Sequence, residues 1–180
     1  MKREMTRFAC RTNVEDWASP FCKRLDGCLQ AEGFQLLDLP WKTFELRKHD
    51  RDHFTMKGFD RFRAALTRAL VRRGVCGRVL VIADSTIDWL NDERRSADAK
   101  LVRSLARRGI QARVVSQSGS GFCALRGVGR DFSTITQRYL RTNAGWRDAT
   151  WVVVGGWNDE WEDVPMSEVR KSIRNLVSLS

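Results

Sequence analysis

Two short, almost purely apolar runs constrain the fold of this chain most strongly. Residues 79–83 (VLVIA) and 151–155 (WVVVG) contain no charged residue and are rich in β-branched side chains. A strand that is apolar on both of its faces needs cover on both, and a parallel sheet receives that cover from helices packed on either side. The two runs therefore predict central strands of a mainly parallel sheet.

Helices and further strands alternate along the rest of the sequence. Strand-like runs recur at residues 35–39 (QLLDL) and 112–116 (ARVVS), and a weaker one at 5–10 (MTRFAC). Apolar residues at helical spacing predict helices near residues 21–29, 59–70, 101–105, 132–140 and 166–177. Thr55, Ser96, Gly74, Gly109 and Pro165 mark the expected helix ends. This alternation predicts a three-layer α/β/α domain around a five-stranded, mainly parallel sheet.

Composition excludes several classes of protein. A chain of 180 residues with 42% apolar residues is the size of one domain and too apolar for intrinsic disorder. We find no apolar run long enough for a membrane span or, near the N-terminus, for a signal peptide. Five cysteines without a Cys-x-x-Cys pair, with two histidines, argue against a disulfide framework and a structural zinc site. We therefore expect a cytoplasmic protein without a membrane partner, metal or cofactor.

The chain is strongly basic. Lys and Arg number 32 against 22 Asp and Glu, which gives a net charge of +10. Arginine binds phosphates and carboxylates, so nucleic acid is a partner to consider. However, the sequence has no run of five like charges, and its densest clusters are Arg72-Arg73 and Arg107-Arg108. We expect the basic residues to be spread among acids, which does not favour nucleic acid as the ligand.

Polar clusters follow the predicted strands where each strand ends. The clusters are residues 84–86 (DST), 116–121 (SQSGSG), 156–159 (GWND) and, after a loop, 50–53 (DRDH). In parallel sheets the carboxyl ends of the strands meet at one edge, and chemistry gathers there.

These clusters contain the residue types that acyl transfer requires. A serine such as Ser85 needs a base, His53 titrates in the right range, and Asp50 could orient that ring through a turn. Gly121 allows a backbone N–H to approach an oxyanion, and Asn158 offers an amide. Taken singly, each also has an ordinary role as a helix cap, turn residue or surface side chain.

Taken together, the four clusters resemble the four sequence blocks of the SGNH (GDSL-type) hydrolase family. Residues 83–86 resemble its Gly-Asp-Ser block, with Ala83 where the family usually has glycine. The resemblance implies that Ser85 is the nucleophile and that its N–H is one oxyanion donor. It also implies that Gly121 and Asn158 supply the other two donors. Residues 50–53 resemble the closing Asp-x-x-His block, which implies Asp50 and His53 as the rest of the triad.

The order of the blocks differs from that of the family and reads as a circular permutation. Residues 1–73 would be equivalent to the family's C-terminal half and residues 79–180 to its N-terminal half, with residues 74–78 as the linker. This interpretation predicts the spatial strand order 112–116, 79–83, 151–155, 4–10, 35–39. It also predicts that Met1 and Ser180 lie near each other.

The resemblance implies a serine esterase or deacylase that forms an acyl-enzyme on a carboxylic ester with a short acyl or acetyl group. The substrate would be a small-molecule or carbohydrate ester, and no cofactor is needed. Two alternatives stay open. One is a basic nucleic-acid-binding module on the same fold with a vestigial site, and the other is an α/β interaction domain whose motif matches are accidental.

Overall fold

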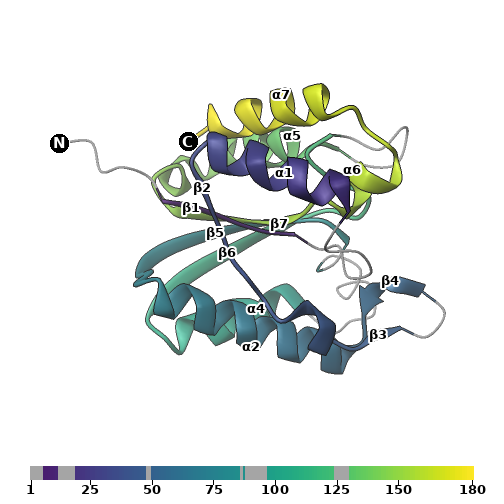
Figure 1. Cartoon of the computed structure of the whole chain (residues 1–180). Coiled ribbons are helices and arrows are strands. Elements are labelled where there is room, and N and C mark those ends of the chain that lie inside the picture. Colours follow the sequence, from purple (N-terminus) through teal and green to yellow (C-terminus); the bar gives the residue numbers. More distant parts are fainter. Residues whose placement is uncertain (1–5, 12–18, 48–49, 86, 88–96, 124–129) are drawn as a thin grey trace.

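The central element of the protein is a sheet of parallel strands, seen in a computed structural model (Figure 1). The structure describes residues 6–11, 19–47, 50–85, 87, 97–123 and 130–180, without the side chains of residues 11, 47, 50–52, 157 and 161. The strands of the sheet are β1 (Arg7–Arg11), β2 (Phe34–Leu36), β5 (Gly77–Ala83), β6 (Ile110–Ser116) and β7 (Thr150–Gly155). Their order is β2-β1-β7-β5-β6 and every pair is parallel. The predicted five-stranded parallel sheet and its strand order are confirmed.

Helices cover both faces of this sheet and make three layers (Figure 1). One layer contains α1 (Pro20–Ala31), α5 (Phe132–Thr142), α6 (Trp157–Trp161) and α7 (Met166–Val177). The opposite layer contains α2 (Met56–Arg72) and α4 (Ala97–Ala106). A short 3-10 helix, η2 (Ala144–Trp146), precedes β7. The predicted α/β/α architecture is confirmed, and none of the described helices is long and apolar enough to cross a membrane.

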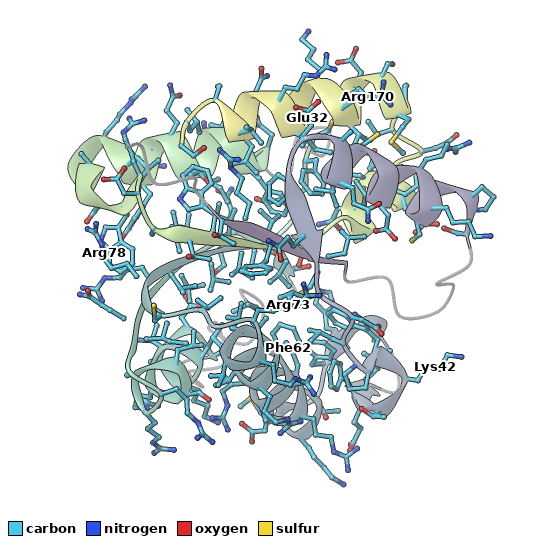
Figure 2. The ribbon with its side chains drawn as sticks, turned by 60° about the vertical axis from the view of Figure 1, so that its left-hand side comes forward. Glu32, Lys42, Phe62, Arg73, Arg78 and Arg170 are labelled. Carbon is cyan, nitrogen blue, oxygen red and sulfur yellow. The ribbon has the colours of Figure 1, made fainter. Side chains whose placement is uncertain are left out.

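Strand β5 shows why residues 79–83 are apolar throughout. Val79, Val81 and Ala83 belong to the core beneath α2 and α4. Leu80 and Ile82 belong to the core on the other face. Because both faces are covered, alternate residues have no solvent-exposed side to occupy. Figure 2 shows the same arrangement from another side, with Phe62 inside the α2 layer and Arg170 on the outside of the α7 layer.

The helix ends follow the local signals in the sequence. The side chain of Thr55 accepts a hydrogen bond from the N–H of Gly58 at 3.0 Å and caps α2, as predicted. Asp131 caps α5 in the same way, through the N–H of Thr134 at 2.8 Å. Pro165 is the N-cap of α7, and the predicted cap Ser96 lies outside the described residues. Gly74 follows α2 with φ +70°, a left-handed conformation that favours glycine.

Residues 50–53 do not form the expected turn. They belong to β4 (Asp50–Phe54), which pairs antiparallel with β3 (Leu46–Arg47) in a separate two-stranded sheet after η1 (Trp41–Thr43). The hairpin is anchored by Phe54, which is 1% exposed and stacks on Trp41 at 6.0 Å and on Phe62 at 5.4 Å between ring centroids. Burial of this aromatic group holds the backbone extended, although the residues before it are mostly charged.

Two positions in the chain bear on the permutation interpretation, namely the start of β5 and the place where the end of the chain lies. Gly77 and Arg78 start β5, so the segment predicted as a linker over residues 74–78 is shorter than expected. At the other junction, Met1 lies outside the described residues, but the Nη2 of Arg7 donates a hydrogen bond to the Oγ of Ser180 at 2.5 Å. The start of β1 and Ser180 are therefore adjacent.

Candidate active site

Three of the four polar clusters meet at the carboxyl edge of the main sheet. Ser85 follows β5, Gly121 follows β6, and Asn158 lies in α6 after β7. Because β5 lies between β6 and β7, the clusters that follow these strands are neighbours at the edge. Figure 1 shows α6 and the β3–β4 hairpin, which carries His53, at this same end of the strands, above and below the sheet respectively.

Ser85 stands at a tight strand-to-helix junction. The preceding Asp84 is 1% exposed, and its N–H donates to the carbonyl of Val154 in the neighbouring strand at 3.3 Å. Ser85 itself is half-buried and helical in conformation. The end of β7 packs closely here, because a Cβ on Gly155 would lie 3.2 Å from the Oδ2 of Asp84 and 2.5 Å from Phe132. Only glycine fits that position without displacement of its neighbours.

The amide of Asn158 is held in a fixed orientation. Its Nδ2 donates a hydrogen bond to the carbonyl oxygen of Ser120 at 2.6 Å. A primary amide carries two N–H donors, so this bond leaves the second one for another acceptor. The same hydrogen bond ties α6 to the loop after β6, next to Gly121.

Asp159 completes this attachment and is a site residue that sequence reasoning did not identify. Its carboxylate is fully buried and accepts hydrogen bonds from the N–H of Phe122 at 2.9 Å and of Cys123 at 2.7 Å. A Cβ on Gly121 would lie 2.7 Å from the Oδ2 of Asp159. Asn158 and Asp159 therefore hold residues 120–123 by three hydrogen bonds, and we call this segment the oxyanion loop because it contains the predicted oxyanion donor Gly121. The sequence signal was present, since an acid directly follows Asn158, but an Asn-Asp pair is also typical of turns and caps.

Asp159 is a buried acid, and burial changes its pKa. Burial raises the pKa of Asp159 from 3.8 to about 6, although the N–H groups of Cys123 and Phe122 act in the opposite direction. The negative charge of the nearby Asp84 adds to the rise.

Cys123 is not a competing nucleophile at neutral pH. Burial, together with the charges of Asp159, Glu168 and Asp131, raises the pKa of its thiol to about 11, although a hydrogen bond with Ser172 lowers it. A thiol with that pKa is protonated at pH 7, and only the thiolate attacks efficiently.

The described residues do not establish the full predicted triad. His53 is half-buried in β4 with its Nε2 atom buried, and no hydrogen bond joins it to Ser85 within the described part of the chain. The side chain of Asp50 lies outside the described residues. Because β4 is extended, backbone positions three residues apart are separated by about 10 Å, rather than brought together by a turn.

Comparison of the chain with protein-family models, curated proteins and solved structures returns no match. Among the residues that the structure describes, no group of His, Cys, Asp and Glu side chains is arranged to hold a metal ion. The site is therefore interpreted from its own residues.

Proposed function

We propose that the protein is a serine hydrolase of SGNH type that cleaves a carboxylic ester with a short acyl group. One observation supports this proposal most strongly. Ser85, Gly121 and Asn158 follow three adjacent strands at one edge, and Asn158 and Asp159 hold the oxyanion loop by hydrogen bonds. During acyl transfer, rigidly held N–H donors beside the nucleophile stabilise the negative charge that develops on the carbonyl oxygen.

In the proposed reaction, the Oγ of Ser85 attacks the ester carbonyl while His53 accepts the hydroxyl proton. The negative charge on the carbonyl oxygen is bound by the N–H groups of Ser85 and Gly121 and by the second amide N–H of Asn158. His53 then gives its proton to the leaving alcohol, and an acyl-enzyme remains on Ser85. Water, deprotonated by His53, releases the acid and restores the serine. The family resemblance, rather than the geometry of β4, assigns Asp50 the role of orienting the imidazole.

Circular permutation is part of the same proposal. The adjacency of Arg7 and Ser180, and β1 placed beside β7, are the geometry that a permuted chain of this family needs. The half of the chain that carries Asp50 and His53 would then precede the half that carries Ser85.

The test is hydrolysis of a short-chain p-nitrophenyl ester, together with labelling by a fluorophosphonate probe. Ser85→Ala and His53→Ala should each lower kcat/KM by at least about a thousandfold, and the double variant should lose little more. Asn158→Ala should cost about a hundredfold to a thousandfold, because two backbone donors remain. The probe should label Ser85.

Ser118→Ala is a matched control, because Ser118 is a half-buried serine in the cluster that follows β6. It should retain labelling and activity. A folded wild-type protein that neither takes up the probe nor cleaves any short ester would refute the proposal. So would a Ser85→Ala variant with unchanged activity.

A further inference from the structure

Among the residues that the structure describes, positive charge is concentrated on one of the two helical layers. Helices α2 and α4, with the residues directly after them, carry Lys57, Arg61, Arg63, Arg68, Arg72, Arg73, Lys100, Arg103, Arg107 and Arg108. The acidic residues of the same segments are Asp60 and Asp98. The two helices pack side by side, and a hydrogen bond joins Thr67 and Ser104 across them at 3.1 Å.

The opposite layer is mixed in charge. Helices α1, α5, α6 and α7 carry Lys23, Arg24, Arg138, Arg141, Arg170, Lys171 and Arg174 together with Asp26, Asp159, Glu160 and Glu168. Glu162 and Asp163 directly follow α6. The expectation that basic residues are spread among acids holds for this layer and is wrong for the layer of α2 and α4. The fold packs the two basic helices α2 and α4, which precede and follow β5 in the sequence, side by side.

A line of exposed cations runs along α2. Lys57, Arg61, Arg68 and Arg72 are all exposed, and their spacing of four and seven residues places them on one helical face. From the first to the last, the line is about 22 Å long at the rise of an α-helix. Arg68 and Arg72 have no hydrogen-bond or ion-pair partner among the described residues. Their guanidinium groups are therefore available to a ligand.

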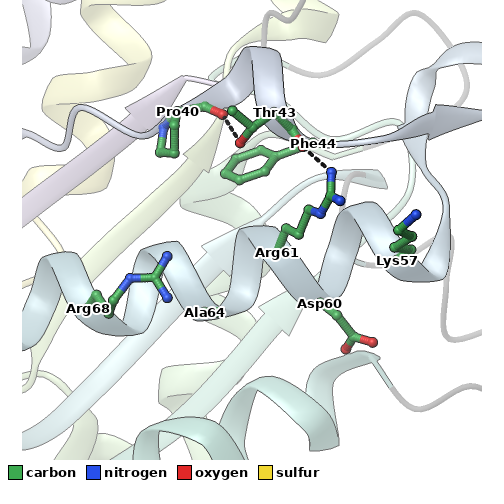
Figure 3. A pocket seen from close by; sticks show the side chains of 8 residues that line it. All are labelled: Pro40, Thr43, Phe44, Lys57, Asp60, Arg61, Ala64 and Arg68. Atoms are coloured by element: carbon green, nitrogen blue, oxygen red, sulfur yellow. Dashed lines mark hydrogen bonds between the residues drawn. The ribbon is translucent and has the colours of Figure 1, made fainter.

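The same face contains an open groove between η1 and α2, with a volume of about 420 Å³ (Figure 3). Its α2 side is lined by Lys57, Asp60, Arg61 and Arg68. Arg61 donates to the carbonyl of Thr43 at 2.9 Å, which positions that guanidinium at the groove wall. The carboxylate of Asp60 is bound by Arg63 at 3.1 Å, so the one acid of the groove is already partly neutralised.

These features indicate which class of ligand this face binds. Among the described residues the only large apolar side chain that is exposed is Val71, so the described part of this face offers no aromatic platform on which single-stranded bases could stack. Recognition must then act through phosphates. A duplex carries one negative charge per about 1.7 Å, so a length of about 22 Å presents about a dozen phosphates. We propose that the face formed by α2 and α4 binds the phosphate backbone of double-stranded nucleic acid without sequence preference.

This inference does not depend on the hydrolase proposal, since none of its residues belongs to the candidate active site. The test is fluorescence anisotropy with a labelled DNA duplex of about 20 base pairs, titrated between about 50 and 200 mM salt. The variant combines Arg61→Gln, Arg68→Gln and Arg72→Gln. The matched control combines Arg138→Gln, Arg141→Gln and Arg170→Gln, which are exposed on the opposite layer and change the net charge equally.

The α2 variant should bind the duplex at least about tenfold more weakly than the wild type. Its slope of log affinity against log salt should be shallower by about 2 to 3, because three phosphate contacts are lost. The control should stay within about twofold of the wild type in affinity. Arg68→Gln alone should make the slope shallower by about 1, which gives a second measurement if the triple variant folds poorly.

Three results would overturn the proposal. Equal losses in the two triple variants would show that net charge acts without a site. Tighter binding to a single strand of the same length would exclude the duplex as the preferred ligand. Binding to phosphatidylserine vesicles without binding to the duplex would assign the face to a membrane surface instead.

Discussion

Replacing the buried Asp159 by asparagine should change how the stability of the protein depends on pH. The carboxyl has a pKa of about 6 in the folded chain, against an ordinary value of 3.8. Between these two values the folded chain holds a proton that the unfolded chain has released. Asp159 therefore favours the folded state fully below about pH 4, and this contribution is lost as the pH rises through about 6.

The size of the effect follows from the shift in pKa. A shift of about two units corresponds to about 3 kcal/mol of unfolding free energy. Asparagine does not titrate, so the stability of the Asp159→Asn variant does not fall in this way as the pH rises through about 6. At any pH the variant also gives up one hydrogen bond to the oxyanion loop, worth about 1 to 3 kcal/mol, because its amide has a single acceptor oxygen. Relative to the wild type, the variant should therefore gain up to about 3 kcal/mol between pH 4 and pH 7.

The measurement is urea unfolding followed by tryptophan fluorescence, for both proteins, at steps from about pH 4 to pH 7.5. The difference between the two free energies of unfolding removes the titration of the groups that they share. Asp131→Asn is the matched control. Although burial raises the pKa of Asp131, hydrogen bonds from Ser133 and Thr134 hold it below its ordinary value. Asp131 therefore titrates below this range, and its variant should differ from the wild type by a constant amount. A constant difference for Asp159→Asn as well would refute the reasoning.

Two further predictions concern the packing that carries His53 and the core beneath the sheet. Gly58→Ala should lower the free energy of unfolding by about 1 to 3 kcal/mol, because the new Cβ would lie 2.0 Å from the carbonyl oxygen of Glu45. Gly27→Ala is the control: it has open space around it and should raise the free energy of unfolding by about 0.5 to 1 kcal/mol. Thermal unfolding measures both, and equal effects would contradict the contact. Phe62→Ala should cost about 3 to 5 kcal/mol, since the ring is fully buried, and lower Tm by about 10 °C or more. A shift of a degree or two would show that the aromatic cluster closes over the cavity.

The sequence by itself determined the layers of this fold and several of its helix ends. Continuous apolar runs such as residues 79–83 can only be strands covered on both faces, and that information is local. Caps such as Thr55 are local as well, because the side chain bonds to an N–H three residues away. The resemblance to SGNH hydrolases supplied the strand order, which the structure has, and it pointed to Ser85, Gly121 and Asn158 at one edge.

Tertiary structure alone decided the rest. Asp159 binds N–H groups 36 and 37 residues away, and no local pattern encodes such a partner. Residues 50–54 form a strand because the ring of Phe54 stacks on Trp41 and Phe62. The segment is mostly charged and has no alternation of apolar and polar residues from which a strand could be predicted. The basic face exists because the sheet places α2 beside α4. A net charge is a sum over the sequence, whereas a charged surface depends on which helices the fold makes neighbours.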